Sequence, residues 1–308
     1  MAQTLEMLAR RTTSMHGIRS VVHTMKTLSV INAAPYDHAA RAIEAYHDTV
    51  LQGLHAVLSQ SVPIEAAPSS KAAPVVVVFG SDHGLCGNYN EALAEHVAQN
   101  ITGATVLCVG AQMADALADQ GLGVQKAFFP PASVDGIGRL ANVLTQKLDE
   151  IRQANHPHGV RVSLAYFARS DSGGQAPEIA ALLPLDPAMV RDLQARPWAS
   201  RSVPQFTMAS EDLFKALIRG HVFASLFRAA AEALVTENAA RLALMQQAER
   251  SVDEKLDALQ SDTRALRQSE ITTELLDVII GFEALKKDRR HKARGPAGDA
   301  TEDGPATP

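Results

Sequence analysis

The chain has 308 residues, of which 46% are hydrophobic and 5% aromatic, and its formal net charge is −5. This length allows two or three domains of a folded protein, and the acidic balance gives no general case for nucleic-acid binding. We expect neither a membrane-spanning helix nor a signal peptide, because no stretch approaches about eighteen uninterrupted apolar residues and the start lacks a charged region followed by an apolar block. The two cysteines, Cys86 and Cys108, make no disulfide framework and favour a reducing cytosolic setting.

Residues 1–60 predict a long helix with a seven-residue apolar repeat. One row of the repeat is Leu8, Met15, Val22, Ser29, Tyr36, Ile43, Val50 and Val57, and a second row is Ile18, Met25, Asn32, Ala39 and Tyr46. Because Pro35 deletes a backbone hydrogen bond and clashes with the carbonyl four residues back, we expect a kink or short break at 32–35. The stretch 61–74, with three prolines and little pattern, predicts a linker.

Residues 74–206 predict a central α/β domain. Expected strands are 75–79, 105–109, 124–129, 160–168 and a short edge strand at 182–185, and expected helices are 88–99, 112–120 and 137–154. The run from Val75 to Phe79 is apolar throughout, which is typical of a central strand that is buried on both faces. Because strands alternate with helices, we expect a Rossmann-like, mostly parallel sheet with covered faces.

Residues 207–287 predict a second long helix. Its apolar positions are Leu242, Met245, Val252, Leu256, Leu259 and Leu266, followed by Ile271, Leu275, Val278, Phe282 and Leu285. A narrow apolar stripe needs a facing helix, and the economical partner is the stripe at the other end of the chain. We therefore expect a long antiparallel coiled coil of the N- and C-terminal helices, a shaft of about 75 Å if roughly fifty residues pair. The tail 288–308 predicts disorder, since it cannot bury enough surface to offset its ordering entropy.

The loop at 80–87 follows the first strand and contains Ser81, Asp82, His83 and Cys86. Open α/β sheets bind ligands at this edge, so a Cys–His hydrolase is one alternative. A nucleophile, a base and an orienting group packed within about six residues rarely reach relay geometry, however. We favour a structural role in which Asp82 or Ser81 caps the following helix and the glycines allow a tight turn.

Cofactor and metal sites are not expected. The loop at 80–87 lacks the lysine followed by Ser or Thr that a P-loop needs. The histidines are scattered, and His156 and His158 have no cysteine or acidic ligand nearby at metal spacing. The residues therefore predict no catalytic, cofactor-binding or metal site, and no enzyme activity for the chain on its own.

Several motifs resemble the gamma subunit of F-type ATP synthases, over about residues 5–285. The most specific is 81–90, Ser-Asp-His-Gly-Leu-Cys-Gly-Asn-Tyr-Asn. Further similar pieces lie at 24–26, 181–185, 237–242 and 267–275. The resemblance implies a central-stalk rotor inside an alpha3beta3 hexamer, with the α/β domain on the membrane-embedded c-subunit ring beside the epsilon subunit. Catalysis would then occur on the beta subunits, and membrane association would be indirect.

The resemblance also implies roles for individual residues, carried over by matching position. The implied beta-subunit contacts and coupling residues are Met25, Arg241, Arg267, Gln268 and Thr272. The implied shaft tip, which would turn in a hydrophobic collar, is Ile271, Leu275, Val278, Phe282 and Leu285. The structural loop contains Asp82, Gly84, Cys86 and Gly87. Gln268 and Thr272 are four residues apart on one helix face, so a single partner loop could hold both.

Two departures from the family pattern are prominent. The basic run after the methionine is replaced by 28–35, Leu-Ser-Val-Ile-Asn-Ala-Ala-Pro, and the arginine of the glycine loop is replaced by His83. These changes resemble a divergent, second-copy bacterial form whose ring carries H⁺ or Na⁺. The resemblance to the family implies a peripheral location on the cytoplasmic side of the bacterial cell (inner) membrane. An alternative from another class is a stand-alone coiled-coil adaptor with a ligand-binding α/β head.

Overall fold

The structure is a computed structural model that describes residues 4–59, 72–170, 174–198, 200–202 and 204–293, with side chains through Lys287. The chain divides into two compact units. Unit 1 comprises residues 1–21 and 250–308, and unit 2 comprises residues 22–249. The boundaries between the units, at 21/22 and 249/250, lie within the two long helices. In the described residues, no helix is both long and apolar enough to cross a lipid bilayer.

The two long helices are α1 (Leu5–Leu58) and α6 (Ser210–Ala293). Helix α1 continues without interruption through Pro35, so the short break, one of the two outcomes expected at 32–35, is absent. Burial of Tyr36, Ala39 and Ala40 in the core anchors the turn after the proline, and this packing outweighs one lost hydrogen bond. Helix α6 extends beyond its predicted end at Lys287, so the first residues of the predicted tail are helical. The remaining tail, 294–308, and most of the predicted linker lie outside the described residues.

The antiparallel pairing of α1 with α6 is confirmed by contacts in each unit. The facing pairs in unit 2 are Gly53 with Leu217, Tyr46 with Phe223, His47 with His221, and Lys26 with Glu249, and unit 1 has Arg19 with Asp253. From pair to pair, the residue numbers rise on α6 as they fall on α1, which is the order that an antiparallel pair requires. A Cβ on Gly220 would lie 3.3 Å from the Tyr46 hydroxyl and from Val50, so this glycine allows close approach of the two helices.

The seam of α1 differs in part from the predicted one. The first predicted row is buried or half-buried along its length, from Leu8 to Val57. The second row is wrong at Ile18 and Asn32, which are exposed, whereas Tyr46 contacts Phe223 of α6 although its side chain is 46% exposed. The inner face instead includes positions four residues after the first row: Ala40 and Leu54, which are buried, and Lys26 and His47, which are half-buried and paired with α6. Apolarity alone could not identify this row, because some of its members are polar.

The central domain contains a five-stranded sheet with the order β3-β2-β1-β4-β5. Its strands are β1 (Ala73–Phe79), β2 (Thr105–Val109), β3 (Val124–Phe128), β4 (Val160–Arg169) and β5 (Gln175–Leu183). Strands β1 to β4 pair in parallel, with Val77 beside Leu107 on one side and Leu164 on the other, whereas β5 is antiparallel to β4. The mostly parallel Rossmann-like sheet is thus confirmed, although its edge strand β5 is longer than predicted.

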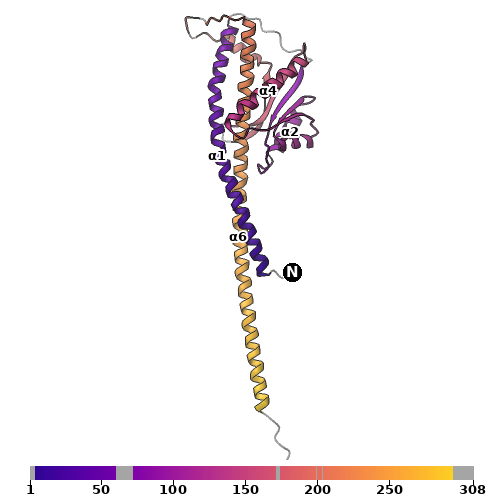
Figure 1. Cartoon of the computed structure of the whole chain (residues 1–308), viewed down its shortest axis with the longest axis vertical. Coiled ribbons are helices and arrows are strands. Elements are labelled where there is room, and N and C mark those ends of the chain that lie inside the picture. Colours follow the sequence, from indigo (N-terminus) through magenta and orange to yellow (C-terminus); the bar gives the residue numbers. More distant parts are fainter. Residues whose placement is uncertain (1–3, 60–71, 171–173, 199, 203, 294–308) are drawn as a thin grey trace, which may run out of the picture. The chain divides into compact units, whose positions relative to one another are not determined.

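Helices cover both faces of the sheet (Figure 1). Helices α2 (Tyr89–Asn100) and α3 (Ala111–Asp119) pack on the face that contains Val76 and Val78. Helix α4 (Val134–Ala154) and the part of α6 from Val222 to Val235 pack on the face that contains Val75 and Val77. A further helix, α5 (Pro187–Ala195), was not predicted, and its Leu193 packs with the end of α1.

Candidate functional site

The loop after β1 is tied to its surroundings by its own polar side chains. The backbone N–H of Ser81 donates to Asn90 Oδ1 at 2.9 Å, and Asn90 Nδ2 donates to Ser81 Oγ at 2.8 Å. Asp82 Oδ1 accepts from the backbone N–H of Ala111 at 3.1 Å. Asp82 therefore binds the first turn of α3, not that of the following helix α2 as predicted. The sheet order explains this difference, because the carboxyl ends of β1 and β2 are neighbours.

The turn at the end of this loop uses two left-handed residues. Gly87 has a φ of 70°, which glycine adopts without steric cost, so the predicted tight turn is present there. Leu85 has a φ of 65° although it carries a side chain, and it is exposed. A Cβ on Gly84 would meet nothing within 4 Å, so no steric constraint explains a glycine at that position.

Cys86 does not form the nucleophile–base pair that a Cys–His hydrolase needs. Its side chain is 5% exposed, and Sγ donates to the backbone carbonyl of His83 at 3.9 Å and lies 3.5 Å from Ser81 Oγ. Burial raises the pKa of the thiol, and the hydrogen bond with Ser81 offsets this only in part. A buried neutral thiol is a poor nucleophile, so the geometry favours the structural role.

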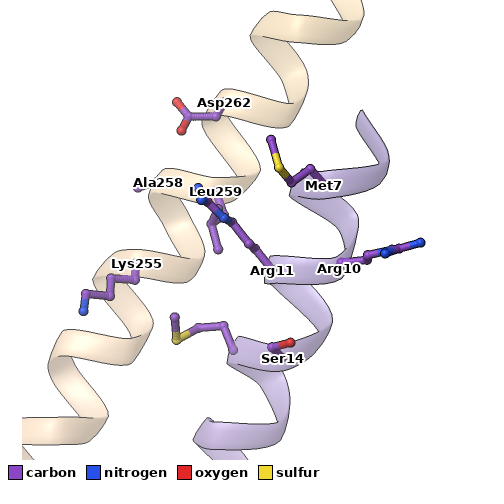
Figure 2. A pocket seen from close by; sticks show the side chains of 9 residues that line it. Met7, Arg10, Arg11, Ser14, Lys255, Ala258, Leu259 and Asp262 are labelled. Atoms are coloured by element: carbon purple, nitrogen blue, oxygen red, sulfur yellow. The ribbon is translucent and has the colours of Figure 1, made fainter. Parts of the chain in front are cut away.

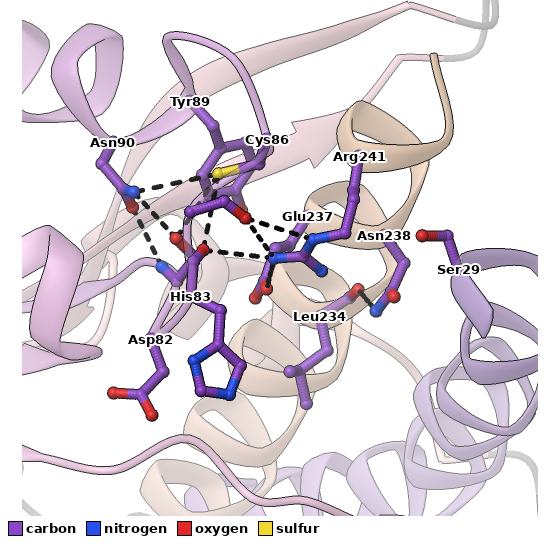
Figure 3. A network of polar contacts seen from close by, with 12 residues as sticks. Ser29, Asp82, His83, Cys86, Tyr89, Asn90, Leu234, Glu237, Asn238 and Arg241 are labelled. Atoms are coloured by element: carbon purple, nitrogen blue, oxygen red, sulfur yellow. Dashed lines mark hydrogen bonds and ion pairs between the residues drawn. The ribbon is translucent and has the colours of Figure 1, made fainter. Parts of the chain in front are cut away.

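Arg241 lies in α6 and contacts this same loop (Figure 3). Its Nη2 donates to the His83 carbonyl at 3.2 Å and to Glu237 Oε1 at 2.6 Å, and its Nε donates to the Gly84 carbonyl at 3.4 Å. The side chains of Arg241 and Glu237 are 11% and 9% exposed. Burial raises the pKa of Glu237, and the adjacent guanidinium opposes that rise. The resemblance to the family implied a contact of Arg241 with a beta subunit, and that contact stays a prediction.

Met25, the implied coupling residue, is half-buried on α1. Its carbonyl accepts a hydrogen bond from Ser29 Oγ at 2.9 Å, and Ser29 is buried. The neighbouring Lys26 donates to Glu249 of α6 at 2.6 Å. Sequence reasoning missed Lys26 and Glu249 as members of the helix seam, since neither is apolar.

The other implied beta-subunit contacts, Arg267, Gln268 and Thr272, lie exposed on α6. Thr272 Oγ1 donates to the Gln268 carbonyl at 2.8 Å within the helix, which leaves its oxygen able to accept another hydrogen bond. These residues therefore share one exposed helical segment, as their spacing predicted. Their contact with a partner stays a prediction.

The implied shaft tip is an exposed apolar stretch of α6, which we call the α6 tip and define as residues 271–285. Its large apolar side chains are between 52% and 73% exposed. They are the five predicted residues Ile271, Leu275, Val278, Phe282 and Leu285, together with Leu276, Ile279 and Ile280. The sequence analysis omitted Leu276, Ile279 and Ile280 because it followed a single apolar stripe along the helix. The apolar run Val-Ile-Ile at 278–280 shows that more than one face of the helix is apolar.

A cavity of about 570 Å³ lies in unit 1 between the first turns of α1 and residues 255–262 of α6 (Figure 2). Met7, Met15, Ala258 and Leu259 supply its apolar wall. Its polar lining is Arg10, Arg11, Ser14, Lys255 and Asp262. Arg10 also donates to Glu6 at 2.6 Å on its own helix. No pattern in the sequence predicts this cavity.

Within the described residues, the structure contains no group of three or more His, Cys, Asp or Glu side chains that could hold a metal ion. The polar groups of the loop after β1 are bonded to one another and to α3 and α6. This region therefore has the chemistry of a structural joint between elements.

Comparisons with known proteins agree with this architecture. The family model described as ATP synthase matches residues 4–285. The chain is 27% identical to the ATP synthase gamma chain of Lachnoclostridium phytofermentans, over 90% of this chain and 98% of that protein. It is also 27% identical to the ATP synthase gamma chain of Nitratidesulfovibrio vulgaris, over 88% and 96% of the two chains.

A similar fold occurs in a solved structure of the Euglena gracilis mitochondrial ATP synthase, titled OSCP/F1/c-ring, rotational state 3. The TM-score is 0.61 at 15% identity, with 97% of this chain and 99% of that chain covered. At this identity the likeness concerns the fold alone. The family model spans both long helices and the α/β domain between them, and so this chain belongs to the ATP synthase family.

Proposed function

We propose that this chain is the gamma subunit of the central stalk of an F-type ATP synthase, a non-catalytic rotor that couples rotation of a c-subunit ring to conformational changes of the catalytic beta subunits. The observation that carries the proposal is the exposure of the large apolar side chains of the α6 tip, in a chain that belongs to the ATP synthase family. A helix that is apolar and exposed on several sides needs a partner, because exposed apolar patches of this extent mark interaction sites.

The proposed partner of the α6 tip is the apolar collar of an alpha3beta3 hexamer. Burial of a large apolar side chain contributes about 1.5–3 kcal/mol, so even partial burial of the tip would hold it firmly. An apolar collar also suits rotation, since such contacts are not directional. The solved complexes with a similar fold carry titles that name a rotor and a c-ring, which supports the same assignment.

The paired helices α1 and α6 would act as the shaft, and the α/β domain would bear on the c-ring beside an epsilon subunit. Within unit 2 the shaft is joined to the sheet by a polar link besides its apolar core. Arg169 at the end of β4 donates to Glu232 of α6 and to Asp37 of α1, both at 2.7 Å. The hydrogen bond from Arg169 lowers the pKa of Asp37. The guanidinium of Arg169 thus links β4, α6 and α1, as we expect for a domain that must rotate as one rigid body with the shaft.

The finer assignments follow from the resemblance. The coupling ion is H⁺ or Na⁺, and the complex is placed on the cytoplasmic side of a bacterial cell membrane, with this chain as a peripheral subunit. Met25, Arg267, Gln268 and Thr272 are proposed to contact the beta subunits. Exposure of the last three in the isolated chain supports their availability to a partner.

Reconstitution with purified alpha and beta subunits tests the proposal. The full chain is expected to raise the ATPase activity of these subunits, and Gln268→Ala combined with Thr272→Ala is expected to lower that activity several-fold. Arg250→Ala is the matched control, because Arg250 is exposed on the same helix. A chain that neither associates with alpha and beta subunits nor changes their ATPase activity would contradict the proposal and favour the stand-alone adaptor.

A further inference from the structure

Arg241 directs one edge of its guanidinium into its own chain. The edge formed by Nε and Nη2 donates to the carbonyls of His83 and Gly84, at distances between 3.2 and 3.4 Å. Nη2 also donates to Glu237, whose carboxylate is almost wholly buried. A buried carboxylate needs such a partner, because it loses its hydration without compensation when left alone. A partner carboxylate therefore cannot bind this edge of Arg241 in two-pronged fashion unless the loop releases it.

Arg241 also has a particular position along α6. The apolar contacts between α6 and the core around β1 and α4 run from Val222 to Val235. Tyr89 of α2 donates its hydroxyl to the Ala233 carbonyl at 3.1 Å. Among the hydrogen bonds of the described residues that join α6 to the α/β domain, those of Arg241 lie farthest along the helix. Beyond it, Glu249 binds Lys26 of α1 instead.

The loop that Arg241 holds is rigidly connected to the sheet. It begins at Gly80, whose N–H donates to the Val109 carbonyl of β2 at 2.9 Å. A Cβ on Gly80 would lie 2.4 Å from the side chain of Met113 in α3, so the loop and α3 are in close contact. Displacement of the loop would therefore displace β1, β2 and α3 together.

We propose that Arg241, Glu237 and the carbonyls of His83 and Gly84 form a clamp, which we call the Arg241 clamp, that fixes the loop after β1 to α6 where α6 leaves the α/β domain. In a rotor, the Arg241 clamp passes torque between α6 and the α/β domain. The torque role rests on the proposed function, whereas the clamp itself can be tested on the isolated chain.

Cys86 is a built-in reporter of the clamp. It lies in the held loop, and its thiol donates to the same His83 carbonyl that Arg241 binds. Cys108, wholly buried in β2, provides the internal reference. The experiment measures labelling rates of both thiols with iodoacetamide at fixed pH on the full chain, with mass spectrometry to separate the two sites.

Arg241→Gln is expected to raise the labelling rate of Cys86 by roughly ten- to a hundred-fold, because loss of several charge-assisted hydrogen bonds favours local opening of the loop. Arg241→Lys keeps a charge beside Glu237 but not the planar fork, so an intermediate rate is expected. Arg250→Gln, an exposed arginine further along α6, is the matched control and should label as the wild type does. Cys108 should stay protected in every variant.

Equal Cys86 labelling rates in the wild type and folded Arg241→Gln would overturn the clamp. Equal acceleration of Cys86 and Cys108 would also overturn it, since that result indicates loosening of the whole domain. Should Arg241→Gln not fold, Arg241→Lys decides instead: a Cys86 rate less than roughly threefold above wild type rejects the clamp.

The torque role is tested separately in the complete membrane complex. Arg241→Gln is expected to lower the number of ions transported per ATP hydrolysed. A parallel fall of transport and hydrolysis would instead indicate that Arg241 acts on a beta subunit. If the chain does not assemble into such a complex, the proposed function fails, while the labelling result still decides the clamp.

Discussion

Two stretches of α6 are both rich in apolar residues but have opposite surroundings. In residues 222–235 the large apolar side chains are buried or half-buried against the sheet, α4 and α1. In the α6 tip they are more than half exposed. The comparison shows that one helix serves two purposes: its earlier part is built into the fold, whereas its later part retains apolar surface for a partner. The burial of the side chains distinguishes residues 222–235 from the α6 tip, whereas the spacing of apolar residues in the sequence does not.

The largest expected effect is on folding stability within the earlier stretch. Leu226 is wholly buried, so Leu226→Ala should lower the free energy of unfolding by about 2–5 kcal/mol through lost transfer energy and a residual cavity. Leu275→Ala in the α6 tip makes the same chemical change at an exposed position and should stay within about 0.5 kcal/mol. Urea unfolding of the isolated chain, followed by circular dichroism, measures both. Equal losses would contradict the contrast between the two stretches.

A smaller effect is expected from pH at the helix seam. His47 Nε2 lies 2.9 Å from His221 Nδ1, so at least one ring must be neutral to accept the hydrogen bond. Burial lowers the pKa of His221 to about 4, and electrostatic repulsion from His47 and Arg228 adds to this effect. The pKa of His47 is also lowered, by burial and Arg228, with Asp48 opposing. The unfolded chain, with a histidine pKa of about 6.5, therefore binds more protons between about pH 4 and 6.5.

Stability should accordingly be highest above about pH 6.5 and fall by roughly 1–3 kcal/mol as the pH drops to about 4. Chemical unfolding measured at several pH values provides the test. His221→Asn is the control, because an amide does not titrate and the variant should lose much of this slope. A slope in the variant as steep as in the wild type would assign the pH dependence to other groups.

The smallest effect is expected at the exposed ion pairs of unit 1. Arg19 Nε lies 2.8 Å from Asp253 Oδ1, and both side chains are about half exposed. Solvent screens such pairs, so Asp253→Ala should lower the free energy of unfolding by less than about 1 kcal/mol. The difference should shrink further when salt is added. A loss above about 2 kcal/mol would show that this pair contributes far more than its exposure suggests.

The sequence predicted the secondary structure of the α/β domain well, because its strands are apolar runs bounded by turn residues. It also predicted the antiparallel partnership of α1 and α6, since neither apolar stripe can shield itself. It allowed for a break at Pro35 that is absent, because tertiary packing of Tyr36 outweighs the local defect. The predicted edge strand was shorter than β5, because residues 175–181 are exposed or half-buried and therefore lack an apolar pattern.

The site was predictable as a set of residues but not as a set of contacts. The motif around Cys86 and the position of Arg241 could be read from the chain. Their meeting could not, because Arg241 binds backbone carbonyls, which carry no sequence signal. The partner of Asp82 was missed for a similar reason, since its acceptor oxygen binds a backbone N–H of α3.

Hydrogen exchange of the chain with and without alpha and beta subunits tests the central claim most directly. The amides of the α6 tip should exchange rapidly in the isolated chain, because a helical segment without tertiary packing opens readily, and should become strongly protected in the assembled complex. The amides of residues 222–235 should be protected in both states. A complex that forms while the α6 tip exchanges as fast as in the isolated chain would contradict the account of α6 as a shaft held in a collar.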